Sequence, residues 1–198
     1  MAHYAYISNK KHIQGHLKEL EEVKQKQNDL TYENVEEDQQ KLNELIEEEK
    51  AIQEKINLSL CDVVKVITGV DEIDENGEDK TEYWEKYYNH GYPEWKVKRM
   101  SYNTIQGTHT QGNTPFRKNY VGVGGIYDPV RDAFYEKPIN SYWILDEEKC
   151  IWLPPSSWVQ DEKENWIPPV EKPHSEDGSL YEWDEDNVTW KKIENGNN

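Results

Sequence analysis

The feature that most constrains the fold is a long proline-free stretch that separates two strand-like segments. From about Lys10 to Leu58 the chain has no proline and one glycine, and Glu, Lys, Gln, Asn and Leu dominate it. Its apolar residues recur at helical spacing. They form two stripes, one of Ile13, Leu17, Leu20 and Val23 and the other of Leu42, Leu45, Ile52 and Ile56. The stretch is therefore predicted to be helical.

A run of turn-forming residues, 28–34, divides this stretch into two helices. Asn34 and Glu37 predict an N-cap with a capping box at the start of the second helix. The stripes follow the a/d spacing of a coiled coil, but each is only a few heptads long. A helix this polar is marginal by itself, so we expect the two to pair as an antiparallel hairpin or to pack on a partner.

The flanking segments predict that the helices interrupt a β-hairpin. Residues 3–7 are aromatic and β-branched, and residues 61–69 alternate like a strand that stops at Gly69. Because loop closure costs little more as loops lengthen, a hairpin turn tolerates such an insertion. Further along, residues 81–88 predict a short helix, residues 95–100 a strand and residues 101–113 an aperiodic loop.

The C-terminal half contains an approximate repeat of an aromatic residue, an acidic turn and a second aromatic residue. The four pairs are Tyr127 and Phe134, Trp143 and Trp152, Trp158 and Trp166, and Trp183 and Trp190. Asp at a turn start bonds its own backbone, and aromatic residues opposite one another stabilise hairpins. Each unit is thus predicted to be a small β-hairpin, with prolines ending the strands between units.

Six of the eight tryptophans lie at or beyond Trp143, where few aliphatic residues are available to cover them. They must pack on each other or face another protein. Because Trp is enriched at interface hot spots, we expect a partner-binding surface. Its predicted residues are Trp143, Trp152, Trp158, Trp166, Trp183 and Trp190.

Together these patterns predict an α+β protein, a small β-rich domain of hairpins with a protruding helical hairpin near its N-terminus. The expected divisions are a β-rich core of residues 1–8 plus 61–137, a helical insertion of residues 9–60, and an extended Pro/Trp-rich segment of residues 138–198. A hydrophobic content of 34% is low for a folded domain. The 8 Trp and 13 Tyr nevertheless supply large side-chain surfaces that can be buried, so we expect the chain to fold.

The net charge of the chain indicates which classes of binding partner are disfavoured. The formal charge of −17 repels nucleic acid and anionic membranes, so we expect neither as a partner. The N-terminus lacks the pattern of a signal peptide, and no run of about 18 apolar residues predicts a membrane span. We therefore expect a protein made in the cytosol.

Candidate catalytic and metal sites are weak. Cys61 and Cys150 lack partner spacing and are expected to be free, buried thiols. His12 and His16 stand four apart on the predicted helix but lack a third ligand. Residues 72–78 resemble half of a calcium loop whose twelfth position is Tyr83 instead of Glu, so an acidic hairpin loop is favoured. Glycines 122–125 predict a bulge or close chain approach rather than a dinucleotide site.

With no nucleophile, zinc or phosphate-loop motif, we expect no enzyme, no cofactor and no metal. One alternative class remains from the residues alone. Tryptophans exposed on β-hairpins could stack on sugar rings, which would make the chain a glycan-binding protein.

Several segments resemble small structural proteins of marine tailed phages, especially phages that infect cyanobacteria. The similarity lies in residues 1–5, 101–104, 114–124, 127–128 and 132–134 and in the Trp/Pro/Asp-Gly tail, and it spans residues 1–8 and 61–190. In that family the first strand enters the second through a short turn, so residues 9–60 are an insertion here.

The resemblance implies a virion component that contacts other virion proteins in the capsid or tail, with self-association also open. Capsid decoration is the first expectation, because small acidic accessory proteins suit addition to an assembled shell, where many copies give avidity. A tail, neck or fibre-associated protein and a glycan-binding adhesion module are the alternatives.

Overall fold

The computed structural model describes residues 2–31, 34–175 and 178–193 and confirms the α+β class. Chain contacts divide it into two compact units, Met1–Glu136 and Lys137–Asn198. Unit 1 contains the helices and the largest sheet, and unit 2 consists of two-stranded hairpins. No helix in the described ranges is long and apolar enough to cross a membrane.

The sheet of unit 1 has five strands in the order β3-β1-β2-β6-β7. The strands are β1 (Ala2–Ser8), β2 (Cys61–Gly69), β3 (Lys96–Met100), β6 (Ile126–Asp128) and β7 (Ala133–Tyr135). Strand β1 is antiparallel to β2, with Ser8 opposite Asp62 and Ala2 opposite Gly69, and is antiparallel to β3 on its other edge. The predicted hairpin with a helical excursion at its turn is therefore present.

Strand β1 is buried on both faces, which its alternating side chains make possible. Ala5 and Ile7 pack in one cluster with Met100 and Phe134. Tyr4 and Tyr6 pack in the other, against Trp84, Tyr88, Tyr92 and Trp95 on and after α3 (Thr81–Asn89). The predicted short helix thus covers one face of the sheet.

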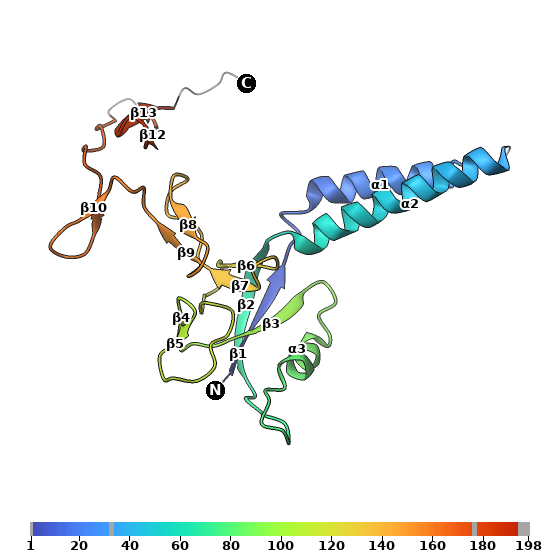
Figure 1. The fold of residues 1–198 in the computed structure, drawn as a ribbon, viewed down its shortest axis with the longest axis horizontal. Coiled ribbons are helices and arrows are strands. Elements are labelled where there is room, and N and C mark those ends of the chain that lie inside the picture. The colour runs from blue at the N-terminus through green and yellow to red at the C-terminus, as the bar shows by residue number, and fades with distance from the viewer. Residues whose placement is uncertain (1, 32–33, 176–177, 194–198) are drawn as a thin grey trace. The chain divides into compact units, whose positions relative to one another are not determined.

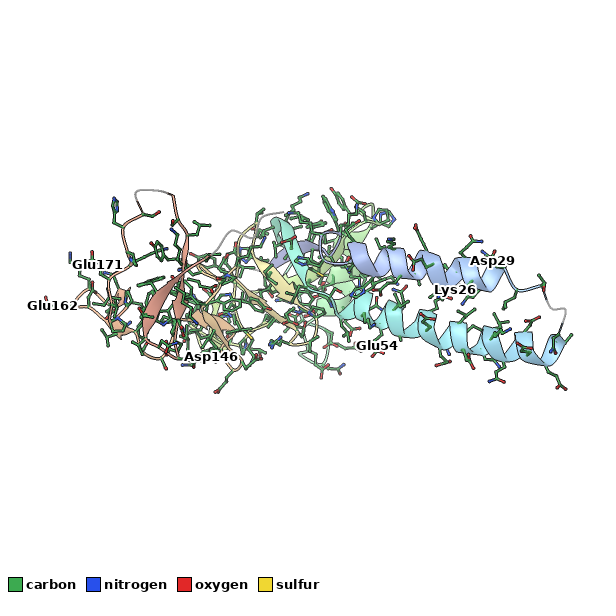
Figure 2. The ribbon with its side chains drawn as sticks, turned by 90° about the horizontal axis from the view of Figure 1, so that it is seen from above. Lys26, Asp29, Glu54, Asp146, Glu162 and Glu171 are labelled. Carbon is green, nitrogen blue, oxygen red and sulfur yellow. The ribbon has the colours of Figure 1, made fainter. Side chains whose placement is uncertain are left out.

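Helices α1 (Gln14–Asn28) and α2 (Val35–Leu58) lie side by side at the turn between β1 and β2 (Figure 1). Their shared core contains Val23, Ile52 and Ile56, whereas Leu17 from the predicted stripe is 39% exposed. Figure 2 shows polar side chains projecting from both helices, among them Lys26 of α1 and Glu54 of α2. The pairing of the stripes is therefore largely as predicted.

Two details of the helical hairpin differ from prediction. Asn34 is the N-cap, but its side chain donates to the Glu37 carboxylate (3.1 Å) instead of capping a backbone N–H, so the capping box does not form. Helix α1 begins at Gln14, so His12 precedes it, and its Nε2 lies 3.4 Å from Asp62. Residues 32–33 of the predicted turn lie outside the described residues.

The segment 101–113, predicted to be an ordered or semi-ordered loop, contains a short hairpin that was not predicted. Strands β4 (Thr104–Ile105) and β5 (Thr108–His109) pair, and the turn residues Gln106 and Gly107 have φ of 52° and 77°. Both central residues with positive φ are typical of the type I′ turn of a two-residue hairpin. Gln-Gly lacks the usual Asn or Asp at the first position, which hid the turn from sequence analysis.

The described residues of unit 2 form three separate hairpins, as the aromatic repeat predicts. Their strands are β8 (Ile144–Asp146), β9 (Ile151–Leu153), β10 (Val159–Gln160), β11 (Trp166–Ile167), β12 (Tyr181–Asp184) and β13 (Thr189–Lys192). The fourth predicted hairpin, β6–β7, belongs to the sheet of unit 1.

Candidate protein-binding surface

An aspartate starts the turn of each of the four repeat hairpins. The Asp128 Oδ1 atom accepts from the backbone N–H groups of Val130 (2.9 Å) and Arg131 (3.1 Å), and Asp146 Oδ1 accepts in the same way from Glu148 and Lys149. Asp161 and Asp184 likewise accept from backbone N–H groups in their own turns. The predicted bond from Asp to its own turn is confirmed.

Each turn also ends on a residue in the left-handed region. These residues are Asp132 (φ 44°), Cys150 (52°), Glu164 (63°) and Val188 (49°). Each directly precedes, or lies two residues before, the second strand of its hairpin. None is glycine, and Val188 is β-branched, so its backbone is strained most.

The spacing of the aromatic residues decides which of them face each other. In the two units with a spacing of seven, Tyr127 lies opposite Phe134 and Trp183 opposite Trp190. In the longer units Trp152 lies opposite Leu145 and Trp166 opposite Gln160. Trp143 and Trp158 therefore precede their hairpins, and the expected cross-strand aromatic pair forms in only half of the repeat.

Three tryptophans form the centre of unit 2. The rings of Trp183 and Trp190 lie 5.2 Å apart, Trp158 contacts both, and Tyr142 packs against Trp158 and Trp190. Trp183 and Trp190 are 6% and 9% exposed. These two predicted partner-binding residues are core residues that hold hairpin β12–β13 to the Trp158 segment.

Glu185 links the same elements by hydrogen bonds. Its carboxylate accepts from Trp183 Nε1 (2.7 Å), from the Ser157 hydroxyl (2.7 Å) and backbone N–H (2.9 Å), and from the Ser156 hydroxyl (2.8 Å). These donors, that of Trp183 first, lower the pKa of Glu185 to about 2. The adjacent Asp184 has its pKa lowered to about 2 by Lys191 and Asn187.

Beside this core lies an apolar groove of about 430 Å³, here called the hairpin groove. It is lined by Ile144, Leu145, Asp146, Leu153, Pro154, Pro155, Ser156, Trp158 and Trp166. Ile144 is 61% exposed and Trp166 is 40% exposed, while the Trp158 indole N–H is buried without a hydrogen-bond partner in the described part of the chain. The groove thus offers aromatic and aliphatic surface.

The predicted set of six tryptophans therefore divides by position. Trp158 and Trp166 line the hairpin groove, whereas Trp183 and Trp190 are buried beneath the surface. Trp143 and Trp152 are half-buried and do not line it. The prolines between the repeat units were predicted only to end strands, whereas Pro154 and Pro155 also line the groove, together with Ile144 and Leu153.

The other candidate sites contain ordinary structural contacts. Cys61 and Cys150 are free and buried as predicted, and burial raises the pKa of the Cys61 thiol to about 11. In the calcium-like segment Asp74 accepts from the N–H groups of Asn76 and Glu78, which makes it an acidic hairpin turn. Among the described residues no three His, Cys, Asp or Glu side chains are grouped to hold a metal ion.

Glycine 125 accounts for the predicted close approach in the glycine run. A Cβ atom at this position would lie 2.7 Å from Cβ of Val121, a fully buried residue. Gly125 O also accepts a hydrogen bond from the N–H of Val63, so the segment lies directly against β2.

Comparison of the chain with protein-family models, with curated proteins and with solved structures finds no match.

Proposed function

We propose that the chain is a non-enzymatic structural protein of a phage virion that docks on neighbouring virion proteins through the hairpin groove. The observation that carries the proposal is the exposed apolar surface of that groove. Ile144, Leu153 and Trp166 are all exposed around it, although unit 2 has few apolar residues to spare.

Physical chemistry favours a protein as the occupant of the groove. An apolar concavity with an exposed Trp on its rim suits a protruding apolar side chain of a partner protein. Tryptophan held by a packed core needs little further ordering on binding, which reduces the entropic cost of association.

A capsid surface is the first choice of partner, and the phage resemblance supports it. A site of this size gives modest affinity for a single contact, but a lattice presents many copies of the same surface. A tail, neck or fibre-associated position is the alternative within the virion. Density for the chain on the icosahedral shell or on the tail axis of purified particles distinguishes the two.

The test combines Trp166→Ala with Ile144→Ser in the full chain and measures occupancy on purified particles that lack the native protein. Both side chains are exposed, so the fold should be retained, and occupancy should fall at least roughly tenfold, the effect of losing a hot-spot residue. The matched control is Leu180→Ala, which removes a 62% exposed leucine outside the groove. Unchanged occupancy of the double variant would contradict the proposal.

A further inference from the structure

Unit 1 contains a pocket that is lined mainly by polar side chains, in contrast to the apolar hairpin groove. This polar pocket of about 590 Å³ lies between the acidic turn of residues 71–79 and the segment 101–116. Its volume falls in the range of small-molecule sites, about 300–1,000 Å³. The proposed docking function does not use it.

Arg99 lies at this pocket and is 4% exposed. Its Nη2 donates to Asp71 (2.5 Å), and Nη1 forms an ion pair with Asp79 that lacks hydrogen-bond geometry. The guanidinium also stacks over the Phe116 ring at 4.3 Å. The Nε–H is buried and has no acceptor among the described residues, so one strong donor is unused.

One wall of the pocket is fixed by buried hydrogen bonds. Thr104 is fully buried, and its hydroxyl accepts from the Phe116 N–H (3.1 Å). Asn119 accepts from the Gln106 N–H (2.8 Å) and donates to the Phe134 carbonyl (3.0 Å). These bonds hold the β4–β5 hairpin and the chain that follows it on the sheet, so the wall is preorganised.

The same wall presents neutral polar groups to the pocket. Asn103, Gln111, Asn113 and Thr114 line it, and their side chains have no hydrogen-bond partner among the residues that the structure describes. Each Asn or Gln side-chain amide has two N–H donors and one oxygen acceptor, and the Thr114 hydroxyl can both donate and accept a hydrogen bond. Such a set matches a ligand that carries many hydroxyl groups.

The charged residues around the pocket limit which charge a ligand can carry. Asp71, Glu78 and Asp79 line it and outnumber the Arg99 guanidinium, so an anionic ligand is disfavoured. Asp71 and Asp79 are paired with Arg99, which weakens their attraction for a free cation. We propose that this pocket binds a neutral mono- or disaccharide, and that sugar binding by this chain lies here and not at the tryptophans.

Saturation-transfer difference NMR on the full chain tests this with maltose, lactose, sucrose, trehalose and N-acetylglucosamine, and with glucuronate and glucosamine as charged probes. At least one neutral sugar should give a signal, and glucuronate should give none. The variant Asn103→Ala with Gln111→Ala should weaken binding roughly tenfold, because it removes two hydrogen-bonding amides. These side chains have no partner in the fold, so the thermal transition should not move.

The matched control removes two amides elsewhere, with Asn43→Ala and Gln53→Ala on the exposed surface of α2, and should leave sugar binding unchanged. The absence of signal from all five neutral sugars would overturn the proposal. So would undiminished binding by the pocket variant, or binding of glucosamine alone. The pocket variant should still occupy particles normally, because the pocket is not part of the proposed docking surface. The tests of sugar binding and of docking can therefore fail independently.

Discussion

Glu185 adds hydrogen bonds to the aromatic contacts that hold hairpin β12–β13 to the Trp158 segment. Its carboxylate accepts four hydrogen bonds from the indole of Trp183 and from Ser156 and Ser157, which lie 28 or 29 residues earlier in the chain. An ionised carboxylate is the stronger acceptor, and protonation would replace one acceptor site with a donor facing other donors. The tryptophan core therefore depends on the charge state of this one group.

We predict that unit 2 loses stability in acid. The pKa of Glu185 falls from 4.5 to about 2 and that of Asp184 from 3.8 to about 2 on folding. A group with a depressed folded pKa stabilises the fold fully above its unfolded pKa and loses that contribution as the pH falls through the folded value. The tryptophan emission maximum should shift to the red between about pH 4.5 and pH 2 as Trp183 and Trp190 become exposed.

Glu185→Gln is the control for this prediction. Glutamine keeps one oxygen acceptor but does not titrate, so the variant should be less stable at neutral pH and should lose less stability on acidification. An acid transition of the same depth in both proteins would show that other carboxylates govern it.

The four repeat hairpins share one turn geometry. An aspartate begins each turn, and a residue with left-handed backbone conformation ends it. In unit 2 the residues that end the turns include Cys150 and Val188, whose positive φ angles strain the backbone. An L-residue in this conformation costs about 1–2 kcal/mol, and glycine avoids that cost at some expense in unfolded-state entropy.

We therefore predict that Val188→Gly raises the free energy of unfolding of unit 2 by about 0.5–1 kcal/mol. Denaturant unfolding followed by tryptophan emission measures it. Val159→Gly is the matched control, because Val159 is an exposed residue of strand β10 without positive φ, and glycine there should destabilise. Destabilisation by both substitutions would mean that Val188 makes contacts that outweigh its strain.

These elements show what sequence patterns could and could not predict. The hairpins followed from Asp and aromatic spacing, and the helix pair followed from apolar periodicity, because both signals are local. Trp166 is exposed and Trp190 is buried, although each is the second aromatic residue of its repeat unit. Burial depends on which segments return to cover a strand, as residues 156–158 do for Trp183, and local spacing does not encode that.

Unit 1 combines a sheet with an insertion that contributes little to it. The connections from the helices to the sheet are polar and sparse, such as Asn9 Nδ2 to Ile56 O (3.0 Å) and His12 to Asp62 (3.4 Å). The apolar cores of the hairpin and of the sheet share no residues. The insertion should therefore be separable from the sheet.

We predict that replacing residues 9–60 by Asn-Gly leaves unit 1 folded. Ser8 and Asp62 are already opposite each other, and the replacement joins them through three residues, an accepted hairpin length. Far-UV circular dichroism should lose most of its helical signal, while the thermal transition persists and particle occupancy is unchanged. Loss of occupancy would move the docking surface to α1 and α2.

The interior position of β1, between β3 and β2, has a consequence for synthesis on the ribosome. Its two neighbours, β2 and β3, begin at Cys61 and Lys96, so the first strand emerges long before either edge can be paired. Helices form from local contacts within microseconds, whereas elongation is far slower. The α1–α2 pair can thus form first and carry Cys61 back beside Ser8, which shortens the search that joins β1 to β2. The insertion would then act as a folding guide for the strand that precedes it.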